Sequence, residues 1–195
     1  MLVFIVGRTS GQGLFAKTWM NGCFYDLKGN KYAGLISRHE TEKSIFVGHG
    51  DYIWFKKDKD DEKHMVTSDS MRAYVAGVDS FVVTHVAGLK KLPFIMVVMN
   101  EPIKLYLSRQ IKRYSSISYF IKYDDDIFYY GTNPDDLTEI KKRNFLDAMS
   151  KILTGRPALL EKIKNKEYGF DDLQDIVYYY NGMLAQDYAD KNKGN

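Results

Sequence analysis

The chain has 195 residues, of which 45% are hydrophobic and 27% are charged, and its formal net charge is +3. These proportions belong to an ordinary globular protein and exclude a disordered one. The 28 basic and 25 acidic side chains are mixed along the chain, whereas nucleic-acid-binding proteins carry a dense basic face. No apolar run reaches the ~18 residues of a membrane-spanning helix. We therefore expect no nucleic-acid partner and no transmembrane segment.

The first thirteen residues allow two interpretations. Residues 2–6 are a short apolar run, and residues 7–13 are rich in glycine. The run is either a buried strand that enters a glycine-rich turn or the remnant of a truncated signal peptide with small residues at its cleavage region. A genuine core strand predicts a cytoplasmic protein, and a leader remnant predicts a periplasmic or secreted one.

From Trp19 to Gly131 the apolar residues alternate and are interrupted by turn residues every eight to twelve positions. This pattern predicts an antiparallel meander that forms a curved sheet or a partly open barrel. The mixed-charge residues 56–63 are expected to form a solvated loop, and residues 92–99 a central strand buried on both faces. The strands are expected at residues 23–27, 31–36, 43–47, 52–55, 70–75, 80–86, 92–99, 103–107, 117–123 and 127–131.

After Gly131 the apolar spacing becomes that of helices. Asn133 is expected to cap the first helix and Pro134 to occupy its first position, with Asp135 and Asp136 at the positive end of the helix dipole. Two or three helices are predicted over residues 133–186, followed by a frayed terminus. Because their apolar stripes need a partner, we expect an α+β fold in which residues 14–195 form one domain and the helices pack on the sheet.

Two loops suggest ligand binding but lack the required spacing. Residues 7–13 and Lys17 resemble a phosphate-binding loop, yet three residues separate Gly13 from Lys17, whereas that mechanism needs lysine directly after the last glycine. Asp124, Asp125 and Asp126 do not have the twelve-residue spacing of a calcium-binding loop. We interpret them as a hairpin turn.

The residues that often carry catalysis are scattered. His39, His49, His64 and His85 show no metal-binding spacing, and Ser80 and Ser108 lie outside a nucleophile elbow. Cys23, the only cysteine, is interpreted as a small hydrophobic residue of a strand, and the sequence offers no intramolecular disulfide. Tyr178, Tyr179 and Tyr180 are expected to bury one or two rings, and the others are either a contact patch or ordinary exposed tyrosines. The sequence thus predicts no cofactor or metal and identifies no catalytic residue.

Several segments in this order resemble uncharacterised exported proteins common in Bacteroidetes. These segments are the hairpin at residues 24–36, the strands at 52–58 and 79–83, and the helical run at 145–181. The chain differs from that family at residues 154–156, where Thr-Gly-Arg stands in place of a frequent cysteine. The resemblance implies a secretory leader, and hence favours the interpretation of residues 1–13 as a leader remnant, but it implies no activity.

Three functional hypotheses follow. The first is a non-enzymatic extracytoplasmic module that binds a protein or an envelope component. The second is a hydrolase whose site assembles only in three dimensions from His39, Glu40 or His85. The third is a cytoplasmic nucleotide-binding protein that uses residues 2–13.

Overall fold

The structure is a computed structural model that describes residues 19–38, 51–90, 93–100, 102–108, 111–112, 122–123 and 127–193. The glycine-rich loop at residues 7–13, the expected strand at 43–47 and the three aspartates at 124–126 lie outside these residues. Of residues 111–112 and 122–123 only the backbone is described.

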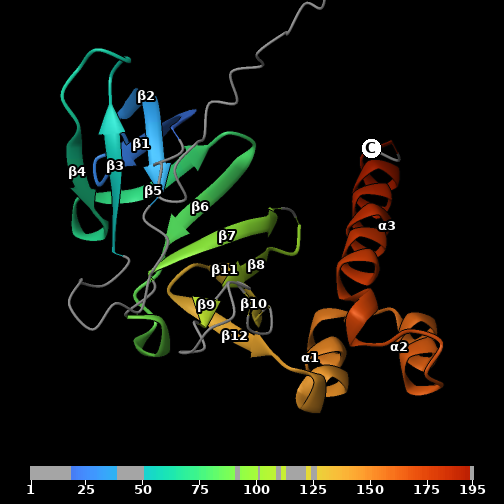
Figure 1. The fold of residues 1–195 in the computed structure, drawn as a ribbon. Helices are drawn as coiled ribbons and strands as arrows, with labels where there is room; N and C mark the ends of the chain where they lie inside the picture. The colour runs from blue at the N-terminus through green and yellow to red at the C-terminus, as the bar shows by residue number, and fades with distance from the viewer. Residues whose placement is uncertain are drawn as a thin grey trace, which may run out of the picture.

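An open antiparallel sheet of ten strands is the largest structural unit of the described chain, and three α-helices follow it (Figure 1). Its strand order is β12-β11-β8-β7-β6-β5-β1-β2-β3-β4. The expected α+β fold class is therefore confirmed. The strands are β1 (Met20–Asp26), β2 (Lys31–Arg38), β3 (Tyr52–Lys56), β4 (His64–Thr67), β5 (Met71–Ala76), β6 (Asp79–Val83), β7 (Phe94–Met99), β8 (Leu105–Ser108), β11 (Ile127–Asn133) and β12 (Asp136–Ile140), with β9 (Ile111–Lys112) and β10 (Lys122–Tyr123) as a separate pair.

The half of the sheet that contains β1 to β5 must curl. β4 and β5 are four places apart in the strand order, which in a flat sheet means roughly 19 Å. Only the 3₁₀ turn Ser68–Ser70 joins Thr67 to Met71, and that connection spans at most about 14 Å. The sheet therefore bends round without closing.

Two glycines permit this bend. Gly22 of β1 and Gly34 of β2 lie directly opposite each other. A Cβ atom on Gly22 would lie 2.0 Å from the backbone oxygen of Val75, and one on Gly34 would lie 2.1 Å from that of Lys56. Because no side chain fits at such distances, glycine is required where four neighbouring strands approach one another.

Two apolar clusters lie on opposite faces of the sheet, one in the curled region and the other over β7, β8 and β11. One cluster lines the inside of the curl and consists of Phe24, Ile36, Ile53, Met71, Tyr74, Ala76, Phe81 and Val83. The other lies on the opposite face, towards β11, and consists of Leu89, Ile95, Tyr106 and Tyr129. Alternate residues of β6 and β7 contribute to each cluster, as expected for strands whose side chains point to opposite faces.

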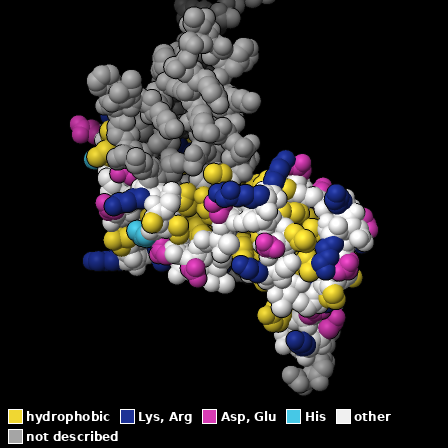
Figure 2. Space-filling model, turned by 90° about the horizontal axis from the view of Figure 1, so that it is seen from below, with side chains coloured by type: hydrophobic (Ala, Val, Ile, Leu, Met, Phe, Trp, Pro, Cys, Tyr) yellow, Lys and Arg dark blue, Asp and Glu magenta, His cyan; other side chains and the backbone are white. Residues whose placement is uncertain are grey.

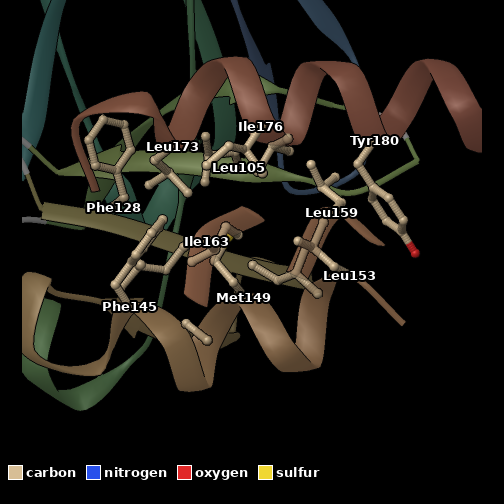
Figure 3. Close-up of a cluster of buried hydrophobic side chains, with 14 of the residues drawn as sticks. Leu105, Phe128, Phe145, Met149, Leu153, Leu159, Ile163, Leu173, Ile176 and Tyr180 are labelled. Atoms are coloured by element: carbon tan, nitrogen blue, oxygen red, sulfur yellow. The ribbon is translucent and has the colours of Figure 1, made fainter. Parts of the chain in front are cut away.

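The helices pack on the end of the sheet formed by β8, β11 and β12. They are α1 (Phe145–Ile152), α2 (Pro157–Lys164) and α3 (Leu173–Lys193). Their buried side chains point towards those of the strands (Figure 3). This confirms that the helices and the sheet share a core, which we call the helix–sheet core: Leu105, Leu107, Phe128, Ile140, Phe145, Ala148, Met149, Ile152, Leu153, Leu159, Ile163, Leu173, Ile176, Val177 and Tyr180.

The predicted start of the helical region at residue 133 is wrong. Residues 133–136 form the turn of the β11–β12 hairpin, in which the Asn133 side chain accepts a hydrogen bond from the Asp135 N–H at 3.0 Å. Asn, Pro and Asp favour turns as well as helix starts. Leu137 packs against the cluster that contains Tyr129, whereas Ile140 belongs to the helix–sheet core. Two residues three positions apart lie on the same side of a helix but on opposite faces of a strand.

Three further expectations need correction. β7 is central, as predicted, but only Ile95 among its side chains is fully buried, whereas all four residues of β8 are buried. Sequence analysis also missed β4, which begins at His64 directly after the exposed charged loop. The expected fraying after residue 186 is wrong as well, because α3 continues to Lys193.

Phe145→Ala tests whether the helix–sheet core supports the whole chain. Phe145 is 7% exposed and its ring lies 5.9 Å from that of Phe170, so its truncation should lower the free energy of unfolding by about 3 to 5 kcal/mol. We expect one cooperative transition in denaturant. Leu146→Ala, at a neighbour that is 42% exposed, is the control and should cost less than about 1 kcal/mol. Two transitions, of which only one shifts, would contradict a shared core.

Gly34→Ala tests the bend of the sheet. The added methyl group would meet the backbone oxygen of Lys56 and the ring of Phe55, so we expect a loss of about 1 to 3 kcal/mol in the free energy of unfolding. Gly88→Ala is the matched control, since no atom lies within 4 Å of its Cβ position. Equal stability of the two variants would mean that the strands do not approach closely at Gly34.

Candidate functional site

A groove lies between α3 and the connection from β7 to β8. Its volume is about 660 Å³. Met99 and Pro102 form one side, and the outward face of α3 forms the rest. Residues three and four positions apart on a helix share a face, so the spacing of Tyr178, Gly182 and Ala185 brings them together. The remaining lining residues of the groove are Tyr179, Asn181, Met183 and Gln186.

The Asn181 side chain fixes the wall of this groove. Its Oδ1 accepts a hydrogen bond from the Ile103 N–H at 2.9 Å, and its Nδ2 donates to the Ile103 carbonyl at 3.2 Å. The amide thus pairs with both polar groups of one backbone residue, as a neighbouring strand would. Since Asn181 is 8% exposed, these bonds satisfy a polar group that would otherwise be costly to bury.

The three consecutive tyrosines of α3 divide between core and surface. Tyr180 is 3% exposed, and its hydroxyl donates a hydrogen bond to the carbonyl of Thr154 at 2.9 Å. Tyr178 and Tyr179 are 75% and 61% exposed. This confirms that one ring is buried and that the others form an exposed patch. Arg156 also pairs with Asp187 further along α3.

The groove has the chemistry of a binding surface. None of the nine lining residues that the structure describes carries a carboxylate, an imidazole, an amine or a thiol. Of the groups that carry most acid–base and covalent catalysis, these residues offer only the phenols of Tyr178 and Tyr179. Apolar and aromatic side chains with a few amides and hydroxyls instead resemble the lining of ligand and protein-docking sites.

A second polar arrangement joins His85, which follows β6, to Asp135 in the β11–β12 turn. One oxygen of Asp135 accepts hydrogen bonds from the His85 backbone N–H at 2.8 Å and from its Nδ1 at 2.9 Å. Both side chains are largely exposed. The backbone hydrogen bond from His85, followed by its side-chain bond and charge, holds the pKa of Asp135 below its ordinary value.

The His85–Asp135 pair has the histidine–carboxylate contact that a catalytic triad also contains. In a triad the carboxylate orients the imidazole while the second ring nitrogen takes a proton from a nucleophile. Within the described part of the chain no hydroxyl or thiol hydrogen-bonds that second nitrogen. The neighbouring Thr84 hydroxyl is buried and donates to the carbonyl of Pro134 at 2.5 Å. The pair therefore links two loops without a nucleophile among these residues.

The other residues singled out from the sequence do not converge. Cys23 and Ser108 are buried in β1 and β8, and Ser80 is half-buried in β6. His64 is exposed at the start of β4. Gly13, Lys17, His39, Glu40, His49, Asp124, Asp125 and Asp126 lie outside the described residues.

Buried tyrosines show the most perturbed acid–base behaviour. Burial, aided by the nearby Glu139 charge, raises the pKa of Tyr129 to about 12, and burial also raises the pKa of Tyr106. Both belong to the apolar cluster towards β11. A phenol that stays neutral in such surroundings serves packing, since nothing in its environment favours loss of its proton.

Within the described ranges no three His, Cys, Asp or Glu side chains gather closely enough to hold a metal ion. In the part of the chain that the structure describes, every buried side-chain nitrogen or oxygen has a hydrogen-bond partner.

No described helix has the length and apolar character needed to cross a bilayer. On the face seen in Figure 2, basic and acidic side chains are interspersed among apolar ones.

Sequence reasoning missed both arrangements. Asp135 lies 50 residues from His85 and was assigned to a helix, so their pairing gave no local signal. The groove needs Met99 and Pro102 beside α3, and this depends on tertiary packing. Only the consecutive tyrosines of α3 could be recognised from the sequence as part of the groove.

The fold and the groove together define an α+β protein with a surface groove whose described lining residues are uncharged. Comparison with known proteins adds no family, because no protein-family model, no curated protein and no solved structure matches the chain.

Asn181→Ala tests the amide pairing at the groove. It leaves the N–H and the carbonyl of Ile103 without their partner, so the free energy of unfolding should fall by about 1 to 3 kcal/mol. Amide hydrogen exchange at Ile103 should accelerate more than exchange in β1. Gln186→Ala, at an exposed position of the same helix, is the control. Unchanged exchange at Ile103 would show that Asn181 does not hold this segment.

Asp135→Asn tests the link to His85 through its pH dependence. The folded pKa of Asp135 is depressed below its ordinary value of 3.8, so its contribution to stability is present above that value and is lost as the pH falls through the folded pKa. The variant should be less stable than the wild type near pH 7, and the difference should shrink below about pH 3.8. Chemical denaturation at several pH values measures this. A difference that stays constant with pH would contradict it.

Proposed function

We propose that the protein is a non-enzymatic binding module that docks a partner protein in the groove between α3 and the β7–β8 connection. The observation that carries this proposal is the exposure of Tyr178 and Tyr179 on a groove whose described lining residues carry no charge. Tyrosine contributes large contact area at a low entropic cost and is enriched at protein interfaces.

The chemistry of the lining defines the kind of partner surface. A charged group brought into the groove would lose water without gaining a charged partner, and such a transfer is costly. Asn181 already bonds Ile103, and Gln186 donates to Asp190 at 2.9 Å. Polar recognition therefore depends on the two tyrosine hydroxyls, on the amide oxygen of Gln186 and on the second N–H of each amide. A partner surface that is apolar at its centre suits this lining.

The methionine side chains of the lining also suit docking. Met99 of β7 and Met183 of α3 both line the groove, and methionine adapts its shape to different partners because it is unbranched and has three rotatable bonds. Gly182 leaves open space on the outward face of α3, since no atom lies within 4 Å of its Cβ position. A partner can therefore approach the helix backbone closely at this point.

We place this module outside the cytoplasm, in the periplasm or secreted. The support is the resemblance of several segments to exported proteins and the apolar run at residues 2–6 followed by small residues. Fractionation of cells that make the full-length protein tests this, and recovery in the cytoplasmic fraction alone would overturn it.

Photo-crosslinking tests the docking surface directly. A photoreactive phenylalanine analogue placed at Tyr178 should give a discrete adduct in the cells that make the protein, because this ring lines the groove. The same analogue at Tyr168, which is also exposed but does not line the groove, is the matched control and should give none.

A groove variant separates docking from folding. Gly182→Glu adds a charge to the groove where a side chain meets no other atom, so the thermal midpoint should not fall. The adduct at residue 178 should then weaken by roughly tenfold or more, as expected when an uncompensated charge enters an apolar contact. Equal adducts at residues 168 and 178, or an adduct that Gly182→Glu leaves unchanged, would refute the proposed site.

A further inference from the structure

We draw no further inference here: the strongest candidate, the exposed row of α3 formed by Tyr178, Gly182, Ala185 and Ala189, belongs except for Ala189 to the groove already described, and nothing in the structure shows what covers the rest of that helix face.

Discussion

The burial of α1 and α3 against β8, β11 and β12 is the interaction on which the rest of the molecule depends. Met149, Ile176 and Val177 are almost completely inaccessible to solvent and meet Leu105 and Ile140 of the sheet. Each such side chain contributes about 1.5 to 3 kcal/mol by leaving water, in a protein whose total stability is expected to be about 5 to 15 kcal/mol. This contact holds most of the buried side of α3 against the sheet, and it thereby fixes the position of the helix that lines the groove.

The two ends of the sheet solve the problem of exposed strand edges differently. At one end β1 to β5 curl, which brings β4 towards β5 through a three-residue turn. At the other end Asn144 caps β12: its Nδ2 donates to the Glu139 carbonyl at 3.0 Å, and its Oδ1 accepts from the Lys141 N–H at 2.6 Å. The Asn144 side chain thus hydrogen-bonds the Glu139 carbonyl and the Lys141 N–H, which would otherwise be available to another strand. The same residue directs the chain from the sheet into α1.

The sequence predicted those parts of the fold in which periodicity and turn chemistry agree. The hairpin at residues 24–36 and the helices within residues 145–181 are such parts. Prediction failed at residues 133–140, where a turn with Asn and Pro fits both a helix start and a hairpin, and only the partner strand decides between them. The candidate site was predictable only in its tyrosines. The amide pairing of Asn181 with Ile103 spans 78 residues, and no local pattern reveals a contact of that range.

The two sides of α3 separate the residues that stabilise the fold from those of the proposed docking surface. Leu173, Ile176, Val177 and Tyr180 hold the helix in the core, whereas Tyr178, Tyr179 and Gly182 face away from it. A substitution on the outer side changes what the groove can contact without creating a cavity, and surface changes of that kind usually alter stability by less than about 0.5 kcal/mol. Asn181 lies between the two sides and belongs to both, because it lines the groove while its amide holds the β7–β8 connection. The position of the groove is therefore fixed by folding, while its lining residues other than Asn181 can change with little effect on the fold.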